Sequence, residues 1–452
     1  PAVAILAQGV FSGVRLGGMR RVLRHVPRWR GFASRPHLEP TAQVEALSQM
    51  NGLPADVATL QHMVMVLQQQ AAEAQRDPDP AIVQRVEESC SHHFRENALT
   101  GDWVVYSPNR SRRPKQIHHT VPGHRYVDTP AHVDNCPFCE GNEADTPPPV
   151  LTYYGEDGKW TLRVVHNKYP AVSQANDRDF GQQHPAFQSA IDGNDPSSNA
   201  MPAFGHHEVV VESPRHDAQL SAQPREHTVM LLRAFWERGR VLRHDRRVRH
   251  LHYFRNQGAA AGASMIHPHS QIVALPIVAT TVLNRIEVAR RFFVRHQEPI
   301  FKRIIDLELQ AQERIVEDSD NFVAMVPYAA LCPFELLIVP KVDGCFFEDI
   351  SEDQLEELGD ILHRVLRRLD TALGAPCYNL VIRTAPYWSR QAYDYQKFFR
   401  WHCAIFPRLG LGAMAGFEFG TGIFCNAHTP EHDAAELRHV RLGELSEFAA
   451  IP

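Results

Sequence analysis

Two histidines and a glutamine alternate along the segment 262–271, directly after a loop of small residues. If this segment is extended, His267, His269 and Gln271 project from one face, because side chains two residues apart share a face of a strand. The glycines and alanines before them let backbone approach a ligand closely. A neutral imidazole is a competent nucleophile toward phosphorus, and a covalent intermediate divides one difficult transfer into two easier ones. A strand with two surface histidines is the alternative interpretation, and only the rest of the chain weighs against it.

A second group that can do chemistry is Cys136-Pro137-Phe138-Cys139, in which two thiols are three residues apart. This spacing lets both thiolates bind one tetrahedral zinc ion, which then needs two further ligands from elsewhere in the chain. A thioredoxin-like redox pair is the rival interpretation, but the flanking residues do not follow its order of strand, Cys-x-x-Cys and helix. The chain contains 26 histidines, so spacing alone does not identify the remaining ligands.

Further motifs surround these two groups. They lie at 97–105, 107–114, 163–170, 209–216, 254–258, 333–335 and 415–422. In their types and their order, the chain resembles the galactose-1-phosphate uridylyltransferase family of the histidine-triad superfamily, with similarity to plant ADP-glucose phosphorylase. Each motif is weak alone, and the ordered set from about Arg95 to about Asn426 makes the resemblance specific.

The resemblance implies a role for each residue that matches a family motif. His269 is implied as the nucleophile that accepts a nucleoside monophosphate, and Gln271 as the amide that hydrogen-bonds the transferred phosphoryl group. Zinc is the implied cofactor, with the ligands Cys136, Cys139, His216 and His267. The implied substrate-binding residues are Arg110, Arg113, Asn167, Asn256, Ala263, Ser264 and Glu418.

The implied activity is a hexose-1-phosphate nucleotidyl transfer in two steps, with a nucleotide sugar as donor and a sugar 1-phosphate as acceptor. Uridylyl transfer is the default of the family. The alternative is an ADP-sugar phosphorylase, which hands an adenylyl group to phosphate and which the segments 262–271 and 416–422 resemble. Zinc bound by His267, two residues before the nucleophile, would orient His269 before each cycle. Preorganised hydrogen-bond donors would stabilise charge on the α-phosphate.

Several implied roles have an ordinary structural alternative. Arg110 and Arg113 suit phosphate because their guanidinium groups are forked and always charged, but they lie in a basic segment that a solvated loop also explains. Asn167 can instead cap the turn before Tyr169. Glu418 matches a carboxylate that contacts sugar hydroxyls in the family, in a stretch that acts across a dimer interface.

The metal ligands also leave alternatives open. His206 and His207 compete with His216, which is favoured only by its Ser-Pro-x-His context. Some family members hold a second metal through histidines in the segment that aligns with 399–404, where only His402 remains. Plant relatives use another Cys-x-x-Cys between the two halves, and 281–330 contains no cysteine. We therefore expect no second metal of the family's kind.

Length and composition limit the class of protein. The chain has 452 residues, of which 44% are hydrophobic, so two or three domains with proper cores are expected. A formal net charge of −5 provides no basic footprint for nucleic acid, and no apolar run is long enough to predict a membrane span. The 8 cysteines are too sparse for a disulfide scaffold.

The segment 1–38 is rich in arginine and has no acidic residue. This composition is typical of an organelle presequence, and Arg30-Gly31-Phe32-Ala33-Ser34 resembles a mitochondrial processing site. Because arginine dominates and serine is scarce, we expect the mitochondrial matrix rather than the plastid.

The following segment, 39–84, is expected to be a helical extension that the family does not explain. Helices are expected at 41–50 and 54–75. Such a hairpin packs on its own domain or docks on another protein. The second alternative, with the presequence, motivates a different class of function: an enzyme-derived structural subunit of a mitochondrial assembly.

The resemblance implies an α+β fold of two tandem histidine-triad-like domains, each an antiparallel sheet with packed helices, plus the helical N-terminal extension. The expected parts are a catalytic domain with the zinc site at 85–280, a connecting helix at 281–317, a second domain at 318–430 and a tail at 431–452. Only the first domain keeps His-x-His, so only it is expected to be catalytic. The second is expected to complete the sugar site and a homodimer.

Secondary structure within the two halves follows from local patterns. Strands are expected near 103–106, 161–165, 208–212, 250–255, 270–275, 321–326, 335–340 and 378–383. Helices are expected near 225–244 and 352–369. The latter helix opens with Ser351 and Gln354 at the spacing of a capping box.

Overall fold

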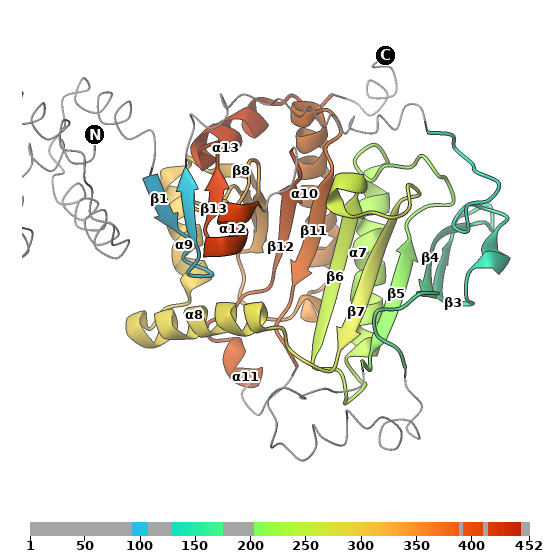
Figure 1. Ribbon diagram of the computed structural model, residues 1–452, viewed down its shortest axis with the longest axis horizontal. Helices are drawn as coiled ribbons and strands as arrows, with labels where there is room; N and C mark the ends of the chain where they lie inside the picture. The colour runs from blue at the N-terminus through green and yellow to red at the C-terminus, as the bar shows by residue number, and fades with distance from the viewer. Residues whose placement is uncertain (1–92, 107–128, 175–202, 388–391, 410–414, 444–452) are drawn as a thin grey trace, which may run out of the picture. The chain divides into compact units, whose positions relative to one another are not determined.

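The computed structural model describes residues 93–106, 129–174, 203–387, 392–409 and 415–443 (Figure 1). The expected presequence and N-terminal helices lie outside the described residues, as do Arg110 and Arg113. The described residues from Phe94 onward belong to one compact unit. The fold is α+β, as the sequence predicts, with antiparallel pairing throughout its main sheet.

Ten strands form the main sheet, in the order β3-β4-β5-β7-β6-β11-β12-β10-β9-β8. The first half of the sheet contains β3 (Pro149–Tyr154), β4 (Trp160–His166), β5 (His206–Val211), β7 (His269–Leu275) and β6 (His250–Gln257). The second half contains β11 (Tyr378–Arg383), β12 (His402–Pro407), β10 (Leu336–Pro340), β9 (Phe322–Met325) and β8 (Ile315–Asp318). The strands expected near these positions are confirmed.

The two halves of the sheet have the same topology. In the first, α7 (Arg225–Leu242) connects β5 to β6, and β7 then pairs between those two strands. In the second, α10 (Glu352–Leu373) connects β10 to β11, and β12 pairs between them. The halves meet where β6 pairs with β11, so their strands form one continuous sheet rather than a sheet for each half. Pairing at this seam satisfies backbone groups that two separate edges would leave open.

One face of the sheet is covered by α7 and α10, which pack against each other. The predicted capping box at the start of α10 is confirmed, since Gln354 N–H donates to Ser351 Oγ and Ser351 N–H donates to Gln354 Oε1. A Cβ atom on Gly359 would lie 2.4 Å from Val229 Cγ2, so glycine is what lets the two helices approach. Their apolar faces join both halves of the sheet in one large core.

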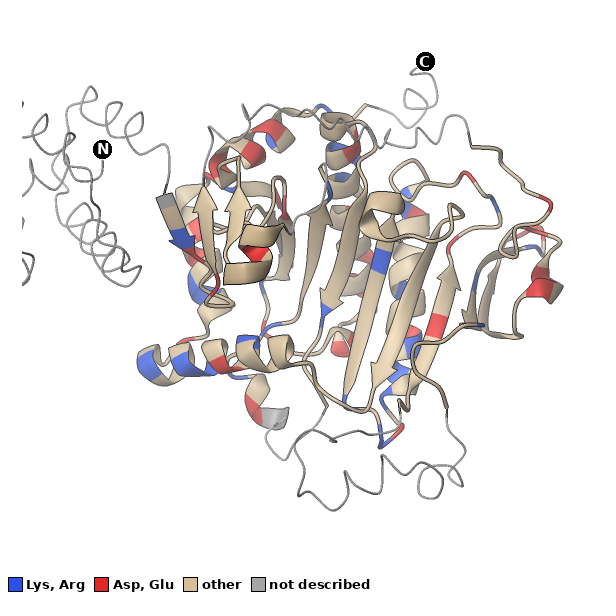
Figure 2. Ribbon diagram, in the orientation of Figure 1, with Lys and Arg blue, Asp and Glu red and all other residues tan. Residues whose placement is uncertain are grey.

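The other face is covered differently in the two halves. Over the second half, α8 (Thr280–His296) and α9 (Ile300–Ala311) pack with Phe398 and Phe399 on the strands. Over the first half, the hydrophobic cluster on this face is small and contains Val165, Val209 and Val211. Figure 2 shows that the charged residues in the outer turns of α8 are mainly basic.

The segment 281–317 was predicted as one connecting helix, but it is not one continuous helix. Gln297 ends α8 in the left-handed conformation (φ 55°) and Pro299 precedes α9, so the segment forms two helices. Its last residues belong to β8. A left-handed residue followed by proline interrupts the helical hydrogen bonds.

A smaller sheet contains β1 (His93–Glu96), β2 (Trp103–Tyr106) and β13 (Phe424–Asn426), with β13 parallel to β2. Beside it lie α12 (Gly416–Thr421) and α13 (Pro430–His439). The expected tail at 431–452 therefore begins inside a helix, which Arg95 ties to the smaller sheet through an ion pair of 2.8 Å with Glu431. Within the described part of the chain, no helix is both long and apolar enough to cross a membrane.

Candidate active site

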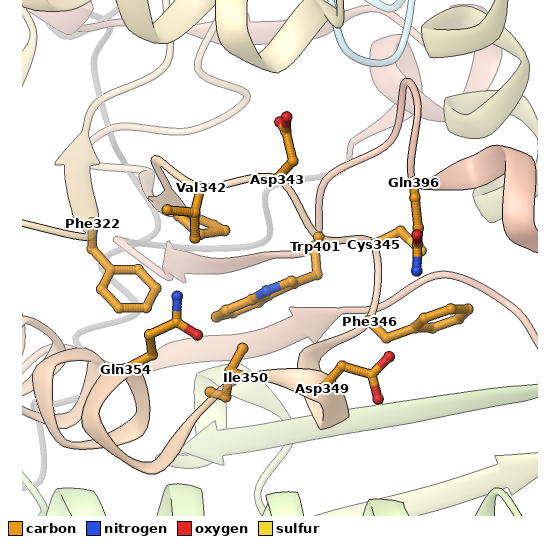
Figure 3. A pocket seen from close by; sticks show the side chains of 12 residues that line it. Phe322, Val342, Asp343, Cys345, Phe346, Asp349, Ile350, Gln354, Gln396 and Trp401 are labelled. Atoms are coloured by element: carbon orange, nitrogen blue, oxygen red, sulfur yellow. The ribbon is translucent and has the colours of Figure 1, made fainter.

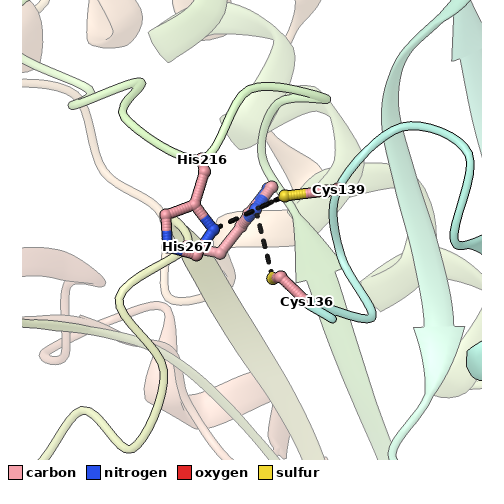
Figure 4. A group of neighbouring side chains, drawn as sticks. All are labelled: Cys136, Cys139, His216 and His267. Atoms are coloured by element: carbon pink, nitrogen blue, oxygen red, sulfur yellow. Dashed lines mark hydrogen bonds between the residues drawn. The ribbon is translucent and has the colours of Figure 1, made fainter. Parts of the chain in front are cut away.

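The four residues implied as zinc ligands converge at the end of the first half of the sheet (Figure 4). The ligand atoms of Cys136, Cys139, His216 and His267 all lie within 4.8 Å of one another, and all four residues are buried. Cys139 Sγ lies 3.5 Å from His216 Nδ1 and 3.6 Å from His267 Nδ1. Ligand atoms about 2.0 to 2.3 Å from one tetrahedral ion are about 3.5 Å apart, so this group fits a metal ion.

The orientation of His267 suits a metal ligand. Its Nε2–H donates to the carbonyl oxygen of Ser213 at 2.8 Å, so the Nδ1 lone pair faces the thiols. Burial lowers the pKa of His267 to about 4, which keeps the imidazole neutral. Burial also raises the pKa of Cys139 to about 11, and the thiol beside it adds to this shift. A bound cation would reverse the shift at Cys139, because the thiolate is the form that binds metal.

His206 and His207 do not join this group. His206 Nε2 lies 3.1 Å from Asp245 Oδ2, and His207 contacts Gln271 instead. The third and fourth candidate ligands beside Cys136 and Cys139 are therefore His216 and His267.

His269 begins β7 and is held in one tautomer. Its Nδ1–H donates to the carbonyl oxygen of His267 at 2.9 Å, which leaves the Nε2 lone pair free. Burial lowers the pKa of His269, so the ring is neutral at neutral pH. Phe138, between the two cysteines, packs 5.6 Å from the His269 ring and 5.8 Å from the His267 ring. The metal-ligand group and the nucleophile candidate are thus one packed unit.

The strand that carries His269 is supported from its opposite face. Ser270 Oγ donates to the carboxylate of Glu212, which also accepts from Arg255 Nε at 2.9 Å. All three side chains are buried, and Arg255 pairs with Ser270 across the strands. Removing one partner from such a buried pair leaves an uncompensated charge, so the loss of Glu212 or Arg255 should destabilise this support.

Gln271 is oriented by His207, whose part in the site the sequence did not reveal. The backbone N–H of Ala171 donates to His207 Nδ1 at 3.0 Å, so the proton of this neutral ring is on Nε2. That N–H donates to Gln271 Oε1 at 2.7 Å. The NH₂ end of the Gln271 amide is therefore the end left to donate to a ligand.

Asn167 lies at the edge of the same group. Its Oδ1 accepts from Tyr169 N–H at 2.8 Å, so it caps the turn, as the structural alternative predicted. Its Nδ2 lies 3.1 Å from His207 Nε2. A nucleoside contact for Asn167 stays a prediction.

The small-residue loop is joined to the second half of the sheet. Asn256 Oδ1 accepts from Asn379 Nδ2 at 2.8 Å, and the same amide donates to the Ala261 carbonyl oxygen at 2.8 Å. The loop closes where Ala263 N–H donates to the Gly258 carbonyl oxygen at 3.2 Å, and Ser264 follows. Arg408 Nε donates to Asn379 Oδ1 at 2.7 Å. This guanidinium group therefore joins the network, although the sequence did not single out Arg408.

Glu418 is not brought to His269 within one chain. It lies in α12, beside β13 and apart from β7 (Figure 1). Its Oε2 accepts from the backbone N–H of Ala415 at 2.9 Å, and the side chain is buried. Its contact with sugar across a dimer stays a prediction.

His402 occupies the position in the second half that His269 occupies in the first. It begins β12, and its Nδ1 lies 3.1 Å from the Arg400 carbonyl oxygen. Its ring is buried beside Phe301, and burial lowers its pKa to about 3. Arg383 Nη1 lies 3.5 Å from its Nε2. This imidazole is covered by α9, so the corresponding position in the second half is not open for catalysis.

A separate cavity of about 340 Å³ lies in the second half (Figure 3). Its lining includes Phe322, Gln354 and Trp401, with Asp343 and Asp349 at its edge. None of the residues around His269 lines this cavity.

Comparisons with known proteins identify the family of this chain. The family model "Galactose-1-phosphate uridyl transferase, N-terminal domain" matches residues 82–279. A second model, "Domain of unknown function (DUF4921)", matches residues 195–448.

Relatives cover most of the chain. The ADP-glucose phosphorylase of Arabidopsis thaliana is 32% identical over 356 residues, which are 78% of this chain and 95% of that protein. The galactose-1-phosphate uridylyltransferase of Thermotoga maritima is 26% identical over 354 residues, which are 77% of this chain and 98% of that protein.

The solved structure of the Arabidopsis ADP-glucose phosphorylase with bound ADP-glucose has a TM-score of 0.65 and 30% identity, covering 78% of this chain and 100% of that one. The family resemblance predicted from the motifs is therefore confirmed. The chain belongs to the galactose-1-phosphate uridylyltransferase family.

Proposed function

We propose that this chain is an enzyme, a hexose-1-phosphate nucleotidyltransferase that works through a covalent nucleotidyl-His269 intermediate. One observation carries the proposal: His269 Nδ1 is committed to the His267 carbonyl oxygen at 2.9 Å, so Nε2 keeps its lone pair. This neutral ring begins β7, two residues after the candidate metal ligand His267. Family membership supports the same reaction class.

The reaction has two balanced steps. First, His269 Nε2 attacks the α-phosphorus of a nucleotide sugar, a P–N bond forms, and the P–O bond to the departing sugar 1-phosphate breaks. Second, a phosphate oxygen of an incoming sugar 1-phosphate attacks the same phosphorus, the P–N bond breaks, and the imidazole returns to its neutral form. In both steps the Gln271 amide donates to the phosphoryl oxygen, where preorganised donors lower the barrier most.

The remaining substrate contacts are assigned by the family motifs. Ala263 and Ser264 would hold phosphate oxygens through the loop, Asn167 and Asn256 would line the nucleoside pocket, and Arg110 and Arg113 would pair with phosphate charge. Glu418 would contact sugar hydroxyls from the other chain of a homodimer.

Zinc is the metal we propose for the Cys136 group, because two thiolates and two imidazoles form a ligand set that suits it. A site closed by four protein ligands is structural, so bound zinc would fix the start of β7 rather than polarise substrate. Metal analysis of the purified protein tests this, and zinc that is retained in wild type but lost in Cys139→Ser would support it.

A second candidate is an ADP-sugar phosphorylase, in which an adenylyl group passes to phosphate. The 32% identity to the Arabidopsis enzyme supports it without favouring it over the uridylyltransferase. The residues around His269 serve both candidates, so the base of the donor and the chemical class of the acceptor separate them.

Labelling of the protein tests the covalent step. Purified protein is mixed with UDP-glucose or ADP-glucose labelled at the α-phosphate, and acid-labile label on the protein is measured. Label from one donor that His269→Asn loses, and the exposed control His439→Asn keeps, would establish the intermediate and name the base. No label from either donor, with folded and metal-loaded protein, would favour a structural subunit instead.

We also propose that 1–38 directs the chain to the mitochondrial matrix and that 39–84 docks on a mitochondrial assembly. Composition alone supports this part of the proposal. Fractionation would show co-migration with a large mitochondrial particle that deletion of 41–78 abolishes. A free dimer in the matrix would contradict docking, and a cytosolic chain would contradict the targeting.

A further inference from the structure

A second group of potential metal ligands lies far along the chain from the Cys136 group. His428, His432 and Asp433 each offer one ligand atom, and these atoms lie within 4.8 Å of one another. We propose that these three side chains bind a divalent cation of the zinc type. The reaction proposed for His269 does not use them.

The ligand atoms converge on one oxygen. Asp433 Oδ1 lies 2.8 Å from His428 Nδ1 and 3.5 Å from His432 Nδ1. The two imidazole rings meet edge to face, with centroids 5.6 Å apart and planes at 81°. In the Cys136 group, the rings of His216 and His267 are 5.2 Å apart at 84°. The two imidazole pairs therefore have closely similar geometry.

The start of α13 builds this arrangement. Thr429 is the N-cap residue and its side chain accepts from the backbone N–H of His432, so His428 lies just before the helix and His432 in its first turn. His428 N–H donates to Asn426 Oδ1 at 2.9 Å, which fixes the residue before the cap. Asp433 follows His432 directly, and its Oδ1 lies within 3.5 Å of Nδ1 of both rings.

Asp433 is fixed from its other side. Its Oδ2 accepts from the backbone N–H of Phe334 at 2.7 Å, and Phe334 itself is in the left-handed conformation (φ 59°). The side chain of Asp433 is fully buried. Since one oxygen is committed to Phe334, the other is held toward His428 and His432.

The ligand chemistry selects the class of ion. Two imidazole nitrogens and one carboxylate oxygen suit zinc, cobalt or nickel, whereas the absence of thiolate from the three ligands disfavours copper(I). One ion bound by both ring lone pairs and Oδ1 would satisfy all three groups at once. Three protein ligands leave one tetrahedral position to water.

Exposure distinguishes this site from the Cys136 group. The side chains of His428 and His432 are 34% and 58% exposed, so an ion can enter from solvent and leave again. The site should thus be weaker and exchangeable, whereas the Cys136 group is closed and buried.

Zinc titration of the full chain, after dialysis against a weak chelator, tests the proposal. Wild type should bind one more ion than His428→Gln or His432→Gln, or bind it more tightly by on the order of tenfold or more. His439→Gln is the matched control, because His439 is an exposed residue of the same helix whose Nδ1 lies 2.6 Å from the Ala435 carbonyl oxygen. It should bind as wild type does.

Cobalt provides a second readout that separates the two groups. Thiolate-to-cobalt absorption reports the Cys136 group alone and should be the same in wild type and in both histidine variants. Equal ion counts and equal affinities in wild type, His428→Gln and His432→Gln would overturn the proposal. Because His432 is largely exposed, His432→Gln is expected to fold, and its thermal melting is the check on that.

Discussion

His207 Nε2 lies 2.7 Å from Gln271 Oε1, and this contact selects which end of the Gln271 amide faces a ligand. The backbone N–H of Ala171 fixes the His207 tautomer from the other side of the ring. A glutamine amide alone can rotate by half a turn at little cost, which would present its oxygen to the phosphoryl group. The histidine therefore acts through Gln271, as a positioning residue.

Substitution of His207 should slow the transfer of label to His269. In His207→Phe, Gln271 Oε1 loses the N–H that donates to it. We expect labelling of His269 to fall by about tenfold to a hundredfold, which is less than the loss expected when the Gln271 amide itself is removed. His206→Phe is the neighbouring control, since His206 points to Asp245. In a Gln271→Ala background, His207→Phe should not reduce labelling of His269 any further. A further reduction would show that His207 acts independently of Gln271.

The alternation of His267, His269 and Gln271 predicts a shared face because strand periodicity is local. His207 could not be found in this way, since its contact with Gln271 depends on the pairing of β5 with β7. One signal was present: His207, Val209 and Val211 alternate, so they share a face. The role of His207 becomes visible only when β7 is known to be the strand that pairs with β5.

Three strands of the main sheet were not predicted from the sequence, and their positions in the sheet explain why. β3 and β8 are the two edges of the main sheet. In β3 no residue is fully buried, so its burial does not alternate, and β8 has only 4 residues. β12 lies inside the sheet and is buried on both faces, so its residues do not alternate between polar and apolar. The Ser351 capping box, by contrast, is a local signal, and it marks the start of α10 correctly.

The loop before His269 needs glycine at position 258. Gly258 has φ 78°, and a Cβ atom there would lie 2.4 Å from Cys377 Sγ. Gly374, at the end of α10, has φ 67° but no atom within 4 Å of such a Cβ. Gly374→Ala should cost about 1 to 2 kcal/mol from backbone strain alone.

Gly258→Ala should cost more than Gly374→Ala in urea unfolding, because a clash adds to the strain. It should also reduce labelling of His269, since the loop that carries Ala263 and Ser264 must shift. Gly374→Ala should label normally. Equal unfolding energies and normal labelling in both variants would show that the loop tolerates the added methyl group.

Removal of metal should loosen the start of β7. Ions bound only by the folded state stabilise it, by about 2.7 kcal/mol at a hundredfold excess over the dissociation constant. We expect strong chelation, or Cys139→Ser, to lower the thermal midpoint and to reduce labelling of His269. Cys403→Ser is a control for loss of a buried thiol elsewhere. Zinc should restore the chelated wild type but not Cys139→Ser; full labelling without metal would separate the metal from the nucleophile.

His402 should make stability depend on pH. Burial lowers its pKa to about 3, whereas an unfolded histidine has a pKa of about 6.5. Between these values the unfolded chain binds a proton that the folded chain does not, so this residue costs stability as pH falls. The cost is about 1.4 kcal/mol per pH unit below about 6.5.

His402→Phe removes that titration, and its neighbour Phe301 already makes the surroundings aromatic. Urea unfolding of wild type and variant should therefore diverge as pH falls from neutral, with the variant gaining relative to wild type. Other buried groups titrate in both proteins and cancel in the difference. His439→Phe, exposed to solvent, should show no such divergence. A difference between His402→Phe and wild type that stays constant with pH would contradict this prediction, because it would show that the imidazole titrates in the folded chain as it does in the unfolded chain.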